Sequence, residues 1–401
     1  MKASEIMSLS IQQYPYETYK QQREIAPLAW DDSVNAWAAY KFADISKVLK
    51  SKEFSAERVS RARHRYKPEF QPVFDIIARI MIQVDDPVHR HLRDATHAAF
   101  TRTAVVEYEA DIRERCKRLL KPGLERGEIE FMSEFSVPLP LLVIAKIVGV
   151  PSEDLQQIKE WCDAYSWIIL KFYTHIDDAD LEVRSKQVMD FVHYLDEKVE
   201  AALKSPKEDL LSSLALAARD QGILTREQVT ANLMILLNAG NETTTCVLGN
   251  GVRLLLEHPD QRQLLKDDPS LIPNAIEEIM RFETPVTISG RIATTDLELG
   301  GQTIHQEELV LMFLASGNRD PERFENPDKF DVTRTRNHHL SFGTGTHLCA
   351  GIQLARFEAK VAFEFLLPYL DRFELLETTV TWADNLNLRG PKHMNLRIHK
   401  A

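Results

Sequence analysis

Apolar residues recur at helical spacing over most of the chain, which predicts a mainly helical protein. The helical patterns cover residues 14–24, 42–50, 111–120, 152–173 and 180–204. Alternating apolar and polar positions, which are typical of strands, are confined to short stretches. The strand-type stretches lie at about 30–60, 286–312 and 375–401, with residues 36–40 as a first strand and residues 381–401 as a late β-pair.

The longest helical pattern lies near residue 240. Thr225 and Gln228 form a capping box at its start, and Pro259 follows its end at His258. About 33 residues at 1.5 Å each make a rod of roughly 50 Å. Its middle contains Gly240 and three consecutive threonines, which are poor helix formers. This weak point favours a functional role as much as it favours a polar patch on an ordinary bundle helix.

Local sequence signals mark the start of another helix and the position of a turn. Ser152 is the expected N-cap of the helix over 152–173, and Gly300 with Gly301 predicts a hairpin turn. Glu278 and Arg281 stand three residues apart in a short helix and can pair. Such a pair is most often an exposed one that contributes under about 1 kcal/mol.

The composition argues against several classes of protein. The 401 residues carry a net charge of −11 without a basic tail, which argues against nucleic acid as a partner. Four cysteines are scattered without paired spacing, as in a reducing cytoplasm. No apolar run approaches the roughly 18 residues that span a bilayer, and the N-terminus has no signal-peptide pattern. We therefore expect a cytoplasmic protein without a membrane anchor.

The stretch FGTGTHLCAG at 342–351 carries the clearest chemistry. Its glycines let the backbone turn sharply or approach a flat partner, and Cys349 precedes a helical run. Backbone N–H groups at a helix start favour a thiolate, which suits the axial ligand of a haem iron. The alternative is a buried cysteine that only fills space.

This stretch, followed by Leu354, Ala355 and Arg356, resembles the FGxGxHxCxG signature of the cytochromes P450. The resemblance extends from about residue 30 to the end of the chain. It implies one domain over residues 1–401, mainly α with a smaller β region. The expected fold is the family's triangular helical prism, with haem b between the long central helix and the helix after the cysteine. It also makes Cys349 the iron ligand and suggests a soluble bacterial type and a monomer.

Other motifs match the same family. Ala239, Gly240, Glu242 and Thr243 match its oxygen-site motif, in which Thr243 would act on bound oxygen and Glu242 would relay protons. The segment DDPVHRHLR resembles the family's DPPEHxxLR, although Val88 replaces the usual acidic residue. The residues that this resemblance assigns to cofactor binding are Ala239, Gly240, His89, Arg93, Arg291, His347, Phe342, Gly343 and Gly351. The residues that it assigns to a structural network are Glu278, Arg281, Arg334 and His339.

Substrate contacts are expected above the haem. The resemblance makes the helices over 152–204 a lid, and places a turn around 386–388 against the substrate. The expected substrate-contacting residues are Ile235, Asn238, Thr287, Ser289 and Leu388. The basic stretch 58–67 is either a solvated loop or a site for a substrate carboxylate.

The resemblance implies a monooxygenase that inserts one atom of dioxygen into a small hydrophobic substrate. The sequence has no GxGxxG fingerprint, so electrons would come from a ferredoxin or flavodoxin with its NAD(P)H-dependent reductase. Its docking face would use His347, Arg356 and Arg102. The alternatives are a peroxide-driven peroxygenase, against which Glu242 and Thr243 argue, and a haem sensor without turnover. A Cys–His hydrolase or zinc site fails on spacing.

Overall fold

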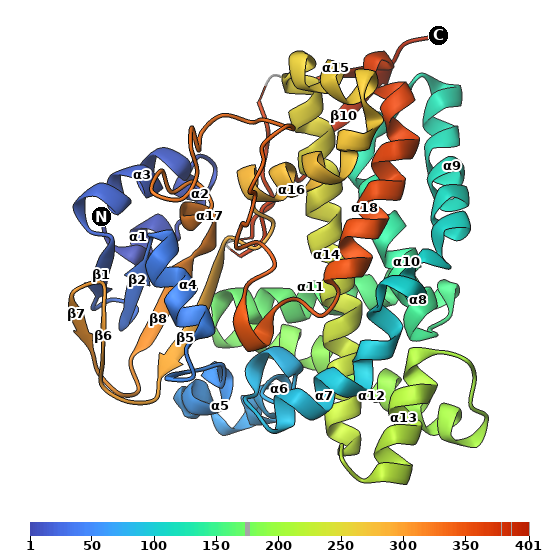
Figure 1. Ribbon diagram of the computed structural model, residues 1–401. Coiled ribbons are helices and arrows are strands. Elements are labelled where there is room, and N and C mark those ends of the chain that lie inside the picture. Colours follow the sequence, from blue (N-terminus) through green and yellow to red (C-terminus); the bar gives the residue numbers. More distant parts are fainter. Residues whose placement is uncertain (173–176, 378, 386, 401) are drawn as a thin grey trace.

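The computed structural model describes residues 1–172, 177–377, 379–385 and 387–400. Helices fill one side of the molecule and most strands lie on the other (Figure 1). The predicted positions Tyr173 and Leu386 lie outside the described residues. The helices are α1 (Ala3–Ile6), α2 (Leu9–Gln12), α3 (Tyr16–Ile25), α4 (Phe42–Lys50), α5 (Arg58–Ala62), α6 (Gln71–Ile77), α7 (Val88–His97), α8 (Arg102–Val106), α9 (Glu109–Arg126), α10 (Pro138–Val148), α11 (Leu155–Lys171), α12 (Asp178–Lys204), α13 (Leu210–Gln221), α14 (Arg226–Glu257), α15 (Pro259–Asp267), α16 (Ile272–Phe282), α17 (Leu314–Gly317) and α18 (Ile352–Leu366).

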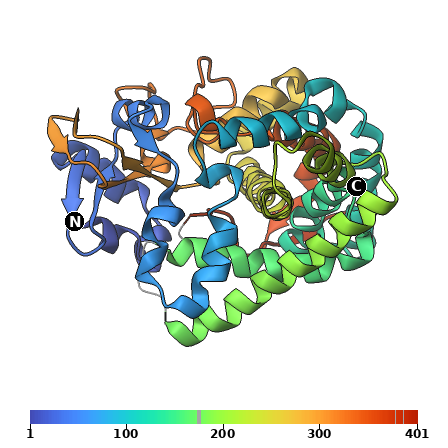
Figure 2. The same ribbon diagram turned by 90° about the horizontal axis from the view of Figure 1, so that it is seen from below.

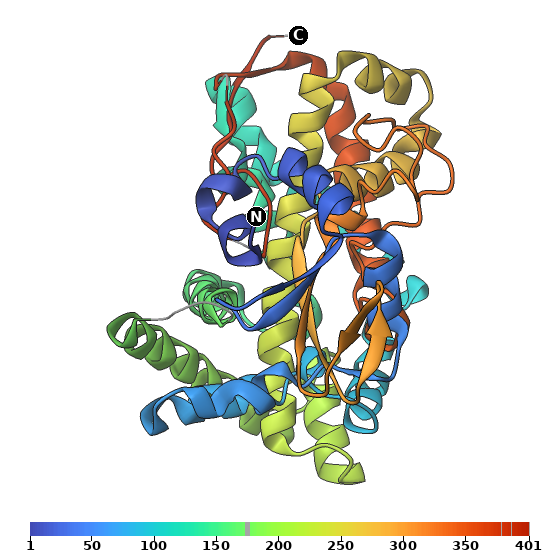
Figure 3. The ribbon, with the colours of Figure 1, turned by 90° about the vertical axis from the view of Figure 1, so that its left-hand side faces the viewer.

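The strands form three small sheets from segments far apart in the sequence. They are β1 (Leu28–Asp31), β2 (Ala36–Ala39), β3 (Phe54–Ser55), β4 (Glu128–Glu130), β5 (Ile288–Ala293), β6 (Leu297–Leu299), β7 (Gln302–Ile304), β8 (Leu309–Phe313), β9 (Phe373–Leu375) and β10 (Asn395–Ile398). The largest sheet has the order β1-β2-β8-β5-β3, in which only β2 and β8 run parallel. It faces the viewer in Figure 3. The strands β6 and β7 make the predicted hairpin, with Gly300 and Gly301 both at positive φ.

Helix α14 is the element around which the other helices pack. Its capping box is confirmed, since Thr225 Oγ1 accepts from Gln228 N–H and Gln228 Oε1 accepts from Thr225 N–H. Its 32 residues are buried on nearly every side, and Figure 2 shows it end-on within the ring of other helices. A Cβ on Gly240 would lie 2.7 Å from Ile144, and one on Gly251 would lie 2.3 Å from Phe363. Both glycines therefore allow close packing, against α10 and α18 respectively.

Two local predictions needed correction. Ser152 makes no cap for α11, which begins at Leu155 after a short turn over Ser152–Asp154. The late β-pair exists as a bridge between Trp382 and Pro391, but β10 pairs with β9 and with β4, a strand that the sequence did not predict. Helix α14 continues through the three threonines and ends at Glu257, so the predicted long helix is confirmed.

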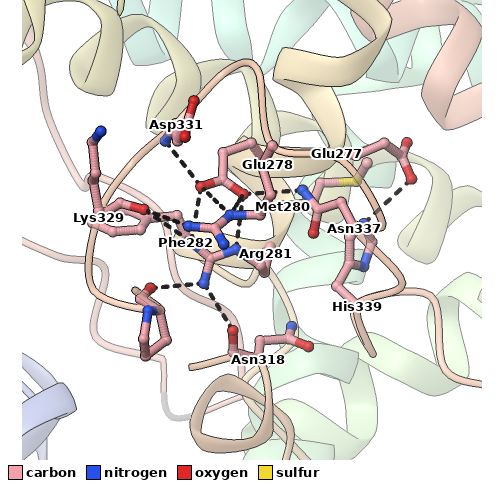
Figure 4. Close-up of polar contacts among 12 residues, drawn as sticks. Glu277, Glu278, Met280, Arg281, Phe282, Asn318, Lys329, Asp331, Asn337 and His339 are labelled. Carbon is pink, nitrogen blue, oxygen red and sulfur yellow. Dashed lines mark hydrogen bonds and ion pairs between the residues drawn. The ribbon is translucent and has the colours of Figure 1, made fainter. Parts of the chain in front are cut away.

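A buried ion network fixes the irregular segment that leads to Cys349 (Figure 4). Arg281 is fully buried and makes two 2.8 Å bonds to Glu278. Arg334 donates to both oxygens of the same carboxylate at 3.1 Å. The remaining guanidinium N–H groups donate to backbone carbonyls, including those of Asn318 and Pro327. The structure thus brings together the three residues that the sequence grouped as a structural triad.

The same region holds the cysteine loop from two further points. Asn318 accepts from Leu340 N–H at 2.7 Å and donates to Ser341 Oγ at 2.9 Å. His339 lies 3.4 Å from Glu277, which also pairs with Arg356 at 2.6 Å. Burial would raise the pKa of Glu277, but His339 and Arg356 outweigh it and lower the pKa to about 2. His339 therefore belongs with the structural residues.

Glu283, just after α16, is the buried anion of a second network. It pairs with Arg389 at 2.7 Å and with Arg253 at 3.0 Å, and accepts from Tyr16 Oη at 2.8 Å. These contacts join the C-terminal segment, α14 and α3. Burial would raise the pKa of Glu283, but Arg389, Arg253 and Arg319 lower it to about 2. The carboxylate form is therefore strongly favoured in the folded state.

We expect Glu283 to contribute to acid unfolding. Its pKa is lower in the folded state than its ordinary value of 4.5, so the stability it contributes is present above pH 4.5 and is lost as the pH falls toward 2. Glu283→Gln should cost roughly 3 kcal/mol near neutral pH, because it leaves the buried arginines without their anion. The difference from wild type should shrink as the pH falls. Urea unfolding from pH 7 to pH 3 measures both effects.

Glu322→Gln is the matched control, since the Glu322–Lys41 pair is exposed and such pairs contribute little. An unfolding midpoint of Glu283→Gln that equals wild type at neutral pH would contradict the expectation.

Candidate functional site

Cys349 lies in a tight loop that ends at the start of α18. Its N–H donates to the carbonyl of Phe342 at 2.9 Å. Gly343 and Gly345 both have positive φ, and a Cβ on Gly345 would lie 2.6 Å from the Leu49 carbonyl oxygen at the end of α4. Gly351 is the N-cap of α18, and a Cβ there would meet nothing within 4 Å. The glycines thus shape the loop and leave one side of it open.

The groups around Cys349 shift the pKa of its thiol in both directions. Burial raises the pKa of its thiol, whereas the Gly351 N–H and the guanidinium groups of Arg93 and Arg356 act in the opposite direction. Arg93 reaches the loop from α7 and donates to the Leu348 carbonyl at 2.6 Å. Helix α7 is therefore attached directly to the residue before the cysteine.

Basic side chains from four separate segments gather beside this loop. His89 on α7 and His347 in the loop have ring centroids 4.1 Å apart. Burial, together with Arg291, His89 and Arg58, lowers the pKa of His347 to about 4 against the opposing effect of Asp85. Arg291 comes from β5 and Arg58 from α5, and both are only 6% exposed. The nearest carboxylate to His347 is Asp85, at 3.9 Å.

This cluster fits an acidic group of a cofactor. Within the part of the chain that the structure describes, His89 Nε2 and Arg58 Nε are buried and have no hydrogen-bond partner. Buried donors of this kind normally have a partner, and two carboxylates beside the cysteine loop would supply one. Haem carries two propionates, so the donors suit the group that the sequence predicts.

Arg58 is the residue of this cluster that sequence reasoning did not single out. The basic stretch 58–67 mostly forms ion pairs, with Arg61 on Glu307, Arg63 on Asp75 and Lys67 on Asp178. Arg58 differs because it donates to the carbonyls of Gly290 and Ile82. The sequence pattern does not separate Arg58 from the other basic residues of this stretch.

The oxygen-site motif lies in the middle of α14. Thr243 is partly exposed and its Oγ1 donates to the carbonyl of Ala239 at 2.8 Å. That bond is a back-bond to the preceding turn, so the hydroxyl oxygen keeps its lone pairs for another donor. Gly240 lies on the α10 side of the helix, against Ile144.

Glu242 is held by the neighbouring helix α11. Ser166 Oγ donates to Glu242 Oε2 at 2.7 Å. Burial, with a smaller upward effect from Asp163, raises the pKa of Glu242 to about 7 against the downward effects of Lys159 and Ser166. Near neutral pH this carboxyl group can therefore both accept and release a proton.

The expected substrate-contacting residues have different surroundings in the structure. Asn238 is 6% exposed and its amide donates to Ser166 Oγ at 2.8 Å and to the Cys162 carbonyl at 3.3 Å, so it contacts α11. Ile235 lies one turn earlier on α14 and is also 6% exposed. Thr287 donates its N–H to the carbonyl before Leu388, and Val286 forms a β-bridge with Leu388. Ser289 is partly exposed on β5.

Comparisons with known proteins place these features in a family. The family model described as Cytochrome P450 matches residues 140–387. The "Biotin biosynthesis cytochrome P450" of Bacillus subtilis (strain 168) is 34% identical over 94% of this chain and 94% of its own. The "Vitamin D(3) 25-hydroxylase" of Pseudonocardia autotrophica is 35% identical over 92% of this chain and 89% of its own.

The fold also matches a solved structure, that of P450BioI in complex with an acyl carrier protein ligated to hexadec-9Z-enoic acid. It has a TM-score of 0.90 and 31% identity, and the match covers 98% of this chain and 100% of that chain. Within the described residues, no helix is both long and apolar enough to cross a membrane.

We expect Arg58 to hold the cofactor through a propionate. Arg58→Met should release haem roughly 10- to 100-fold faster than wild type, because a charge-assisted hydrogen bond contributes about 1.5–3 kcal/mol. The rate of haem transfer to apomyoglobin measures this directly. Arg61→Met is the matched control on the same helix, since Arg61 pairs with Glu307. Equal rates for Arg58→Met and Arg61→Met would contradict the expectation.

Proposed function

This chain belongs to the cytochrome P450 family, and on that premise we propose that Cys349 binds the iron of haem b in a single domain over residues 1–401. The expected fold, mainly helical with a smaller β region, is confirmed by the structural match. The expected class is confirmed as well: the protein is a haem-dependent monooxygenase that acts on small molecules. A thiolate-ligated haem, when bound, supplies the activation of dioxygen for insertion into a C–H or C=C bond.

One observation carries the proposed cofactor site: the loop of Cys349 lies beside buried basic groups with unsatisfied donors. Cys349 would bind the iron on the α18 side, where Gly351 leaves the loop open. Phe342 and Gly343 would lie against the ring. The residues that would hold the propionates are His89, Arg93, Arg291, His347 and Arg58.

We assign the handling of oxygen and protons to the middle of α14. Thr243 would offer its hydroxyl to dioxygen beside Ala239, whereas Gly240 faces Ile144 on the α10 side. Glu242 would hold the next proton, because its pKa of about 7 leaves much of it protonated at neutral pH. This pair supports a monooxygenase over a peroxide-driven enzyme or a sensor, neither of which needs a proton relay.

We propose a ferredoxin or flavodoxin as the electron donor, docking on the face of α7, α8 and the cysteine loop. Arg90 and Arg102 are exposed there, and Leu348 is 36% exposed beside the cysteine. The structure changes two of the expected contacts. His347 is mostly buried against Asp85, and Arg356 pairs with Glu277. The exposed cations of α7 and α8 are therefore the better docking residues for an acidic partner.

We propose a small hydrophobic substrate and would begin with fatty-acyl chains and steroids. The relatives' names point to biotin biosynthesis and to vitamin D(3), and one structure holds a hexadecenoic acyl chain. A site for a substrate carboxylate at the basic stretch 58–67 has less support, because Arg61, Arg63 and Lys67 already form ion pairs. Ile235, Thr287, Ser289 and Leu388 remain the proposed contacts, and Asn238 would act through α11. A screen for the spin-state change of the ferric enzyme would identify binders.

The ligand assignment can be tested with a single substitution. Cys349→Ser should abolish the red-shifted Soret band of the reduced carbonyl complex, because that band requires a thiolate opposite carbon monoxide. Cys116→Ser, Cys162→Ser and Cys246→Ser should keep the band and serve as controls. If the band survives in Cys349→Ser, the assignment is wrong.

The role of Thr243 can be tested through coupling, which is the share of the NADH consumed that forms oxygenated product and not peroxide. Thr243→Ala should keep haem and substrate binding but divert reducing equivalents to peroxide, because the oxygen site loses its hydroxyl. Peroxide formed per NADH, with a surrogate ferredoxin and a binder from the spin-state screen, measures this. Thr244→Ala is the matched control, since Thr244 is a buried neighbour on the same helix. Coupling equal to wild type in Thr243→Ala would remove Thr243 from the mechanism.

A further inference from the structure

A cavity of about 470 Å³ lies between α3, the last turns of α14, the end of α16 and the C-terminal segment 375–394. It is separate from the proposed haem site. Arg253 in its wall stands ten residues after Thr243 on α14, which is roughly 15 Å along the helix axis. None of the described residues that line it belongs to the cysteine loop at 342–351 or to α7. The proposed function therefore leaves this cavity without a role.

Part of the wall is a stack of alternating aromatic rings and guanidinium groups. The guanidinium carbon of Arg319 lies 3.5 Å from the ring centre of Tyr16 and 3.7 Å from that of Phe282. The guanidinium carbon of Arg389 lies 3.5 Å from the ring centre of Trp382. Cation–π contacts at these distances are favourable, and they join three segments that are far apart in the sequence. The cavity thus has a preformed wall, as binding pockets usually do.

Two hydrogen-bond donors in the wall lack an acceptor. Trp382 and Arg253 both line the cavity, and the guanidinium carbon of Arg253 lies 5.0 Å from the ring centre of Trp382. Among the residues that the structure describes, neither Trp382 Nε1 nor Arg253 Nε has a partner, although the two residues are only 4% and 6% exposed. Both atoms can only donate, and buried donors normally have a partner. The missing group is therefore an acceptor oxygen.

The charges around the cavity favour an uncharged acceptor. Glu283 pairs with Arg389 and with Arg253, and Asp328 pairs with Arg319, so the three arginines already have anionic partners. The exposed charged residues of the lining are three carboxylates and one histidine, namely Glu17, Glu257, Glu377 and His393. An anion that entered would meet these carboxylates, and like charges repel.

We propose that this cavity binds a small uncharged molecule with an apolar body and a carbonyl oxygen, which accepts from Trp382 Nε1 and Arg253 Nε. Leu375, Val380 and Met394 in the lining supply apolar contacts for the body. A single water, with a share of about 30 Å³ in the liquid, would fill only a small part of the space. The site goes beyond the proposed function, since it does not involve the haem.

Acetophenone and ethylbenzene form a matched pair of probes, because they share a ring and a two-carbon side chain but only acetophenone has a carbonyl group. The haem-loaded protein, labelled with 5-fluorotryptophan, contains five tryptophans, and the fluorine signal that is absent in Trp382→Phe belongs to Trp382. Acetophenone should shift this signal saturably, with a dissociation constant roughly tenfold lower than that of ethylbenzene, because only acetophenone gives the buried donors a partner.

Trp382→Phe tests the donor itself, since it keeps a ring for Arg389 and removes the N–H. Saturation-transfer NMR, with the haem pocket filled by 4-phenylimidazole, should show that this variant loses most of the preference for acetophenone. Trp30→Phe is the matched control and should keep the preference, because the Trp30 N–H already donates to Asp32 at 2.7 Å.

An unchanged Trp382 signal, equal dissociation constants for the two probes, or a preference that survives in Trp382→Phe would overturn the proposal. The carbonyl Soret band checks that both variants fold. If Trp382→Phe does not fold, the wild-type constants for the two probes decide. The fluorine signal does not depend on the iron ligand, so a wrong assignment of Cys349 would leave this result unaffected.

Discussion

The buried charge of Glu278 is the constraint on which the cysteine loop depends. The segment from Asn318 to Ser341 is largely irregular, so many of its carbonyls find no partner in a helix or sheet. Arg281 and Arg334 supply the missing donors, and Glu278 balances their charge without exposure to water. Apolar side chains of the same volume would fill the space but leave those carbonyls unsatisfied. The position of Cys349 is thus fixed by charge and hydrogen bonding.

The parts of this protein that sequence predicted well obey local rules. The capping box of α14, the glycine hairpin between β6 and β7, and the bounds of α4 each depend on residues within a few positions of one another. The errors arose where distant segments decide. Strand β4 exists because β10 lies beside it, more than 260 positions later in the chain. Ser152 is an error of a different, local kind, since the chain makes a separate short turn before α11.

The distinction between local rules and contacts made by distant segments also applies to the functional site. A motif marks residues by their type and spacing, so Cys349, Glu242 and Thr243 were accessible as candidates from sequence alone. Arg58 was not, because its stretch reads as a uniform basic surface until the fold buries one member and pairs the others. Asn238 shows the reverse case. It occupies a position expected to face the substrate, but the proximity of α11 gives its amide two partners.

Helix α11 contributes several of the groups that act on Glu242. Lys159 and Asp163 stand one turn apart and act on the pKa of Glu242 with opposite signs, beside the larger upward effect of burial. Coulomb energy varies with distance and with local dielectric, and a shift of α11 changes the two effects unequally. The proton affinity of Glu242 is therefore sensitive to the position of α11. In the proposed function Glu242 supplies protons to the oxygen site, so this dependence would link proton supply to any movement of α11.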